Sequence, residues 1–298
     1  MGALKKFFRK YGSSYFLLSF WLILFVFFTL IPILISVFLS FTDFDMVNSF
    51  KFVGADNYIR LFLDDDIFVK SLGNTMYYAL ITGPIGYILS FVIAWLINET
   101  GRTARSLLTL VFYAPSLAGN VFMMWQYIFS GDSYGILNSV LIRFGFISSP
   151  IQWQNDPEYN SVVVITVILW MSMGAGFLAF VAGFKQLDKS LYEAAAMDGL
   201  RNRWQELWYI TLPQMIPQLL ISAVLSISSS FAVGYQNAAL TGNPSTDYST
   251  HTVVLHISDY GYTRLEMGYA CTVAVILFLI MIITWTVLNR ALRSIGHD

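Results

Sequence analysis

Residues 185–217 read KQLDKSLYEAAAMDGLRNRWQELWYITLPQMIP, a polar stretch between two long apolar runs. Ser190 and Glu193 have the S-x-x-E spacing of a capping box, which predicts the start of a helix. Asp198-Gly199 predicts its end, because glycine suits the left-handed conformation that closes many helices. The predicted helix has only about eight residues, a length that is marginal in water. We therefore expect it to lean on the rest of the protein or on a partner.

Outward from this stretch the chain consists of charge-free apolar runs. A hydrocarbon core takes roughly 20 apolar residues per helix, and six runs reach that length. The chain is 56% hydrophobic and 12% charged, and its charged residues fall outside the cores of these runs. The sequence therefore predicts an all-α, polytopic membrane protein with six transmembrane helices. The domain expected over 15–290 has spans at about 15–41, 71–98, 107–130, 160–184, 213–240 and 267–290, between tails 1–14 and 291–298.

The lysine and arginine residues predict the orientation. Of the 17 in the chain, twelve fall in the two tails and the expected inner loops, and five fall in the expected outer loops. Basic residues are enriched on the cytoplasmic side of membrane proteins. We therefore expect both termini to be cytoplasmic, as an even number of spans requires.

Several classes of chemistry have no support in the sequence. The net charge of -1 argues against bulk nucleic-acid binding, and the single cysteine, Cys271, against a disulfide framework. The chain lacks a G-x-x-x-x-G-K-[ST] phosphate loop, so it is not expected to bind ATP in that way. His251 and His256 are expected to be solvated in an outer loop, and residues 64–66 (DDD) to form a solvated acidic turn. The six cores lack ionisable residues, which favours an energy source in a separate protein over ion coupling.

The opening stretch also resembles a known motif, the EAA loop of ABC importer permeases. The resemblance covers Glu193, Ala194, Ala195, Gly199, Ile210, Leu212 and Pro213, with Asp198 and Thr211 as in the sugar-permease version. Leu200 departs from it, since alanine is common there. Residues 52–58 (FVGADNY), 71–75 (SLGNT) and 240–244 (LTGNP) extend the likeness to MalF/UgpA-like sugar permeases.

The resemblance implies the fold of type I ABC importer permeases and a non-catalytic transport subunit. It implies a second, similar permease, two cytoplasmic ATPase subunits that bind ATP and Mg, and an extracellular or periplasmic sugar-binding protein. This chain would bind no cofactor, metal or nucleic acid, and would lie in a bacterial or archaeal plasma membrane. Residues 185–212 would contact an ATPase, through Glu193, Ala194, Ala195, Asp198, Gly199 and Leu200.

A sugar site in a membrane needs hydroxyl and amide groups together with aromatic faces. The third to fifth spans offer such side chains, although serine also mediates helix packing and tryptophan or tyrosine near a span end often lies at the membrane interface. The candidates are Tyr113, Ser116, Asn120, Trp170, Ser172, Ser228, Phe231, Tyr235 and Gln236.

We expect the substrate to be a di- or oligosaccharide. Alternatives are an ABC permease for a glycerol phosphodiester, an amino acid or a peptide, and a secondary transporter that works without an ATPase. A membrane scaffold or channel is a further alternative. The EAA-like loop argues against the last two classes.

Overall fold

A computed structural model of the chain describes residues 16–119, 121–200 and 202–295, with side chains as far as residue 290. In these ranges the regular structure is helical, apart from one isolated antiparallel bridge between Thr42 and Phe52. The contacts divide the chain into two compact units, Met1–Asp65 with Ile257–Ile276, and Asp66–His256 with Leu277–Asp298. For the described residues the expected all-α class is confirmed.

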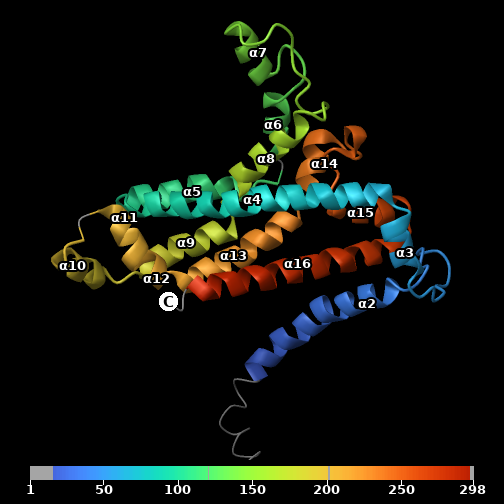
Figure 1. Cartoon of the computed structure of the whole chain (residues 1–298), viewed down its shortest axis with the longest axis horizontal. Coiled ribbons are helices and arrows are strands. Elements are labelled where there is room, and N and C mark those ends of the chain that lie inside the picture. Colours follow the sequence, from blue (N-terminus) through green and yellow to red (C-terminus); the bar gives the residue numbers. More distant parts are fainter. Residues whose placement is uncertain (1–15, 120, 201, 296–298) are drawn as a thin grey trace, which may run out of the picture. The chain divides into compact units, whose positions relative to one another are not determined.

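Most of the helices belong to the second unit (Figure 1). They are α4 (Asp66–Asn98), α5 (Arg102–Leu117), α6 (Phe122–Ile128), α7 (Ile136–Arg143), α8 (Asn160–Met171), α9 (Ala175–Gln186), α10 (Lys189–Met197), α11 (Arg203–Glu206), η2 (Leu207–Thr211), α12 (Leu212–Gln214), α13 (Ile216–Phe231), α14 (Tyr235–Thr241) and η3 (Thr246–Tyr248). Two more helices, α15 (Val253–Ser258) and α16 (Met267–Ile295), run from one unit into the other.

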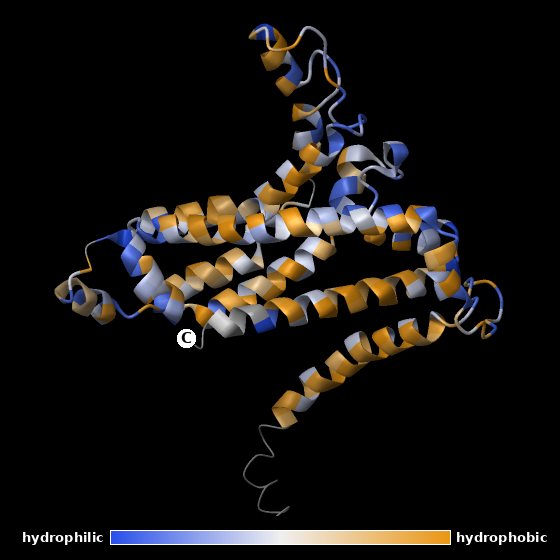
Figure 2. Cartoon of the chain, in the orientation of Figure 1, coloured by the Kyte–Doolittle hydropathy of each residue, from blue (hydrophilic) through white to orange (hydrophobic). Residues whose placement is uncertain are grey.

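Among the described residues, four helical segments are long and apolar enough to cross a membrane: Phe16–Leu39, Asp66–Asn98, Asn160–Gln186 and Met267–Arg290. Figure 2 shows their predominantly apolar composition. Two bent helix pairs raise the number to six if each pair forms one span. One pair is Arg102–Leu117 with Phe122–Ile128, whose break includes residue 120, outside the described residues. The described part of the chain thus holds four to six candidate spans, and the number six remains a prediction.

The second bent pair has an identifiable cause. Residues 203–214 and α13 meet at an angle of 80°, and Met215 between them has φ −90° and ψ 5°. Proline lacks the N–H that an α-helix needs, and its ring collides with the carbonyl four residues earlier. Pro217 stands four residues after Pro213, so the helix breaks between them and restarts at Ile216.

The core of the second unit lies where α4, α9 and α13 run side by side (Figure 1). Phe91 of α4 packs edge-to-face on Phe180 of α9, with ring centroids 5.3 Å apart. Small residues let the helices approach closely. The Ser222 hydroxyl of α13 donates to the Gly176 carbonyl at 2.9 Å, and the Ser226 hydroxyl donates to the Gly83 carbonyl at 3.0 Å. These contacts hold α4, α9 and α13 together.

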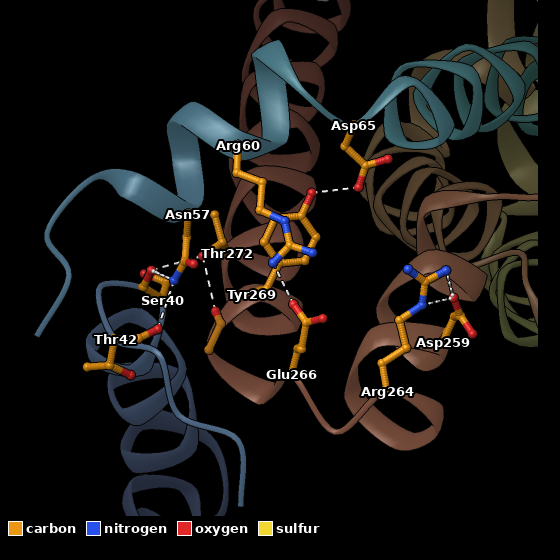
Figure 3. Close-up of polar contacts among 11 residues, drawn as sticks. Ser40, Thr42, Asn57, Arg60, Asp65, Asp259, Arg264, Glu266, Tyr269 and Thr272 are labelled. Carbon is orange, nitrogen blue, oxygen red and sulfur yellow. Dashed lines mark hydrogen bonds and ion pairs between the residues drawn. The ribbon is translucent and has the colours of Figure 1, made fainter. Parts of the chain in front are cut away.

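In the first unit, polar contacts join the end of the first helix to α3 (Asp56–Leu63) and to the start of α16 (Figure 3). That first helix contains η1 (Val26–Leu30) and α2 (Ile31–Leu39). The Asn57 amide donates to the main-chain oxygens of Ser40 and Thr42, at 3.0 and 2.8 Å. The Thr272 hydroxyl also donates to the Ser40 oxygen, at 2.9 Å. Main-chain oxygens left by the end of the helix thereby gain partners.

A charged cluster lies on the side of α3 that also carries Asn57 (Figure 3). Arg60 forms an ion pair with Glu266 at 2.5 Å and lies 4.3 Å from the centre of the Tyr269 ring. The Tyr269 hydroxyl donates to Asp65 at 2.6 Å, and Asp65 is only 9% exposed. The expectation of a solvated acidic turn is therefore wrong for Asp65. The Asp65 carboxylate accepts the hydrogen bond from Tyr269 in place of one from water, and this bond offsets the free-energy cost of burying the carboxylate.

Candidate functional site

A cavity of about 550 Å³ opens among α4, α8, α9 and α13, within the second unit. Its volume lies in the range of small-molecule sites, roughly 300–1,000 Å³. The residues that line it combine hydroxyl groups, aromatic and aliphatic side chains and one amide. They are Thr82, Tyr87, Ser90, Ser116, Ile168, Met171, Ser172, Gly174, Ala175, Gly176, Phe180, Ser222, Leu225, Ser226, Ser228, Ser229, Ser230, Val233 and Gln236.

Four of the side chains predicted for a sugar site meet in this cavity. Ser116 comes from α5, Ser172 from the end of α8, Ser228 from α13 and Gln236 from α14. They are separated by up to 120 positions in the sequence, so only the helix packing brings them together. Their role in binding is taken up below as a proposal.

Four of the other five predicted side chains lie elsewhere among the described residues. Trp170 packs edge-to-face on Trp125, with ring centroids 5.3 Å apart. Tyr113 packs against the core around Phe180, and Phe231 is buried at 3% exposure. Tyr235 is 64% exposed and contacts Phe122 instead. Asn120 lies outside the described residues.

Most of the serines on α13 that line the cavity were not among the predicted residues. Ser222, Ser226, Ser229 and Ser230 line the cavity beside Ser228. Ser226 follows Ser222 by four residues, and Ser229 and Ser230 follow Ser226 by three and four. Residues at such spacings share one face of a helix. That spacing within an otherwise apolar run was the signal that could have found them. Thr82, Tyr87 and Ser90 on α4 also line the cavity, but they are five and three residues apart and do not follow this spacing.

The short helix predicted near residue 190 is α10, which has nine residues. Its first-turn cap is Asp188, whose carboxylate accepts the Ser190 N–H at 2.9 Å. The cap predicted at Ser190 is therefore wrong by two residues, because the helix begins earlier and Asp188 accepts a free N–H group of its first turn, that of Ser190. This hydrogen bond from the Ser190 main chain holds the pKa of Asp188 below its usual value.

The end of α10 is the glycine turn that the sequence predicts. Gly199 has φ +93°, and its N–H donates to the Ala196 oxygen at 3.3 Å. The Leu200 N–H donates to the Ala195 oxygen at 3.0 Å. This pair of bonds is the Schellman motif, which requires the left-handed conformation at the glycine.

One side of α10 rests on the protein and the other is open. Ala195 is buried, and the Tyr192 hydroxyl shares a 2.7 Å hydrogen bond with Thr211. Burial raises the pKa of Tyr192 above its usual value. Leu191 and Met197 are 45% and 89% exposed. The open side therefore presents apolar side chains together with the small residues Ala194 and Ala196.

Arg203 links this region to the end of α4. Its guanidinium forms ion pairs with Glu99 and with Glu206, both at 3.1 Å. Trp204 adds a ring contact to Trp95 of α4, with centroids 5.3 Å apart. The segment after α10 is thus held to α4 by one charged and one aromatic contact.

Comparison with known proteins decides the family. The model of the binding-protein-dependent transport system inner membrane component family matches residues 84–294, which include α10, the glycine turn and every residue that lines the cavity except Thr82. The chain belongs to this family. The predicted resemblance to ABC importer permeases is thereby confirmed, and the permease is a multi-pass protein of the inner membrane and a transport component by family.

Curated relatives match the permease over most of their length. It is 32% identical to the probable ABC transporter permease protein YesP of Bacillus subtilis over 275 residues, which is 90% of this chain and 86% of the relative. It is 29% identical to the lactose transport system permease protein LacF of Rhizobium radiobacter, covering 85% of each chain. It is 27% identical to the arabinooligosaccharides transport system permease protein AraP of Bacillus subtilis, covering 93% of this chain and 87% of the relative.

A solved structure shows the same fold. A chain of a bacterial ABC transporter involved in the import of the acidic polysaccharide alginate superposes with a TM-score of 0.78. The superposition covers 98% of the permease and 99% of that chain, at 21% sequence identity. The permease therefore has the fold of an ABC importer permease.

Two histidines of the permease differ from expectation. His251 and His256 are 2% and 1% exposed, with ring centroids 5.8 Å apart. His256 also faces Phe68 of α4 at 6.0 Å. The expectation that both are solvated is wrong, because they pack into the helical body beside aromatic rings. Among the described residues no three histidine, cysteine, aspartate or glutamate side chains gather as a metal site.

Proposed function

We propose that the chain is a transmembrane permease subunit of an ATP-driven importer for a sugar, a di- or oligosaccharide. It would form the translocation path together with a second permease subunit. Two cytoplasmic ATPase subunits would bind ATP and Mg, and an extracellular or periplasmic binding protein would deliver the sugar. The chain itself would carry no cofactor and catalyse no reaction.

The observation that carries the proposal is the cavity among α4, α8, α9 and α13. It has the volume of a small-molecule site and a lining of hydroxyl groups beside the aromatic rings of Tyr87 and Phe180. A sugar has hydroxyl groups around its edge and apolar C–H faces, so it needs both kinds of contact. We assign substrate binding to Ser116, Ser172, Ser228 and Gln236, together with the further hydroxyl groups of α4 and α13.

The names of the relatives support a sugar as the substrate class. Lactose, arabinooligosaccharides and sulfoquinovosyl glycerol appear in the names of relatives that are 27–29% identical to this chain. Alginate, the substrate in the structural match, is also a saccharide. These names favour a sugar over an amino acid or a peptide.

The open side of α10 supports contact with an ATPase. Leu191 and Met197 expose apolar surface on α10, and hydrogen bonds at both ends of this short helix stabilise it. We assign the contact to residues 185–212, with Glu193, Ala194, Ala195, Asp198, Gly199 and Leu200 at or next to α10. The distribution of lysine and arginine supports a cytoplasmic location for this loop and for both termini.

The test is reconstitution of the chain with its partner permease, ATPases and binding protein in proteoliposomes. Uptake of labelled lactose, arabinotriose and maltotriose is measured with ATP and with a non-hydrolysable analogue. We expect ATP-dependent uptake of at least one sugar. Uptake that proceeds without the ATPases, or that follows an ion gradient instead of ATP, would contradict the proposal.

A further inference from the structure

We infer that the cavity among α4, α8, α9 and α13 accepts an uncharged, polyhydroxylated ligand and rejects anionic sugars. The inference rests on the proposed function and narrows its substrate class. It concerns the chemistry that the cavity wall presents, which no name of a relative determines, since the relatives include importers of neutral and of acidic saccharides.

All of the described residues that line the cavity are uncharged. An anion that leaves water loses its hydration and needs a cation or several hydrogen-bond donors in return. The permease offers a uronate or a phosphodiester no arginine, lysine or histidine among these lining residues.

A serine, threonine or tyrosine hydroxyl has one proton, and most of those in the wall donate it to a main-chain oxygen. Such bonds have lengths of 2.7–3.3 Å, and the acceptors lie within the same helix or on a neighbouring one. They are made by Thr82, Tyr87, Ser90, Ser116, Ser172, Ser222, Ser226, Ser229 and Ser230.

These bonds determine whether the cavity wall presents hydrogen-bond donors or acceptors to a ligand. Because the protons point to the main chain, the hydroxyl oxygens turn lone pairs toward the cavity and act as acceptors. A neutral sugar has many O–H donors and satisfies such a wall. A carboxylate or phosphate has acceptors only, so its oxygens would face the oxygens of the wall.

The remaining lining residues suit the other parts of a sugar ring. Tyr87 and Phe180 meet edge-to-face, with centroids 5.3 Å apart, and present aromatic surface to C–H faces. Gln236 contributes an amide, which supplies both donor and acceptor atoms. An uncharged sugar thus finds acceptors, an amide and aromatic surface in one cavity.

The experiment measures binding to the assembled membrane complex in nanodiscs, with the binding protein omitted so that its specificity does not enter. The neutral probes are lactose, arabinotriose and maltotriose. The anionic probes are digalacturonate, a mannuronate trisaccharide and glycerophosphoglycerol, all ionised at pH 7.5. We expect at least one neutral sugar to bind, and every anionic probe to bind at least tenfold more weakly than that sugar.

A pair of charge variants at one exposed cavity position completes the test. Ser228→Lys adds a cation, and we expect it to gain at least tenfold in affinity for the anionic probes. Ser228→Asp is the matched control of opposite charge and should gain none. Both variants are first checked for assembly with the partner subunits.

Each result bears on a different statement. Anionic probes that bind the unaltered complex as tightly as neutral sugars would overturn the inference and leave the proposed function standing. An assembled Ser228→Lys complex that gains no affinity for anions would also count against the inference. The absence of binding by any saccharide, neutral or anionic, would contradict the proposed function itself.

Discussion

At position 199, only the backbone conformation restricts which amino acids can replace the glycine. Its φ is +93°, and a Cβ added there would meet nothing within 4 Å. We predict that Gly199→Val strains the turn after α10, at a cost of about 1–2 kcal/mol, and lowers retention or stimulation of the ATPases. Gly101→Val is the matched control, because Gly101 also has open space but an ordinary φ of −63°. The measurement is ATP hydrolysis by the purified complex, with and without sugar-loaded binding protein. Equal stimulation in both variants would contradict the role of this turn.

At the scale of the element, α4 offers a test of helix packing with an internal control. A Cβ on Gly86 would lie 3.0 Å from the Cβ of Ser172, whereas a Cβ on Gly73 of the same helix would meet nothing. We predict that Gly86→Ala destabilises the protein by about 1–3 kcal/mol through overpacking. Gly73→Ala should be neutral or slightly stabilising, because alanine favours helix. Thermal unfolding in detergent compares the two, and equal midpoints would show that the α4–α8 contact is looser than described.

The contact between α11 and the end of α4 gives a second prediction at this scale. Arg203 and Glu99 are 65% and 41% exposed, and such surface pairs contribute little to stability, about 0–1 kcal/mol. Reversal of one charge, Arg203→Glu or Glu99→Arg, should therefore leave the melting temperature nearly unchanged. We predict that either reversal lowers sugar-stimulated ATP hydrolysis and that the double reversal restores part of it. No recovery in the double variant would show that the pair does not position the loop.

The elements differ in how far the sequence predicts them. Long apolar runs and the glycine turn at Gly199 depend on local pattern and were predicted correctly in kind. The cap at Asp188, the break at Met215 and the burial of His251 depend on neighbours in space or on competition between adjacent residues. The cavity shows the same division: Ser116 and Gln236 were found by residue type, whereas the spacing of the α13 serines indicates a shared helix face but not that this face lines a cavity with α4 and α9.

At the scale of the whole molecule, the orientation in the membrane can be tested with single cysteines. Cys271 is the sole cysteine, so Cys271→Ser gives a cysteine-less chain. Ser133→Cys and Ser190→Cys then add one thiol each at exposed positions on opposite sides of the predicted topology. We predict that an impermeant maleimide labels intact cells at residue 133 only, and that residue 190 reacts after the membrane is opened. Labelling of both in intact cells would contradict the proposed orientation.

The central proposal is that the cavity among α4, α8, α9 and α13 is part of the translocation path, and we propose that it opens in turn to the two sides of the membrane. The most direct measurement is accessibility of Ser228→Cys in the cysteine-less chain, assembled in proteoliposomes, to an impermeant methanethiosulfonate from each side. Val224→Cys is the control, since Val224 of α13 lines a separate, largely apolar cavity. We predict reaction at residue 228 from the cytoplasmic side without nucleotide and from the outside after trapping with ATP and vanadate, with no reaction at residue 224. Reaction from one side in both states, or from neither side in either state, would contradict the account.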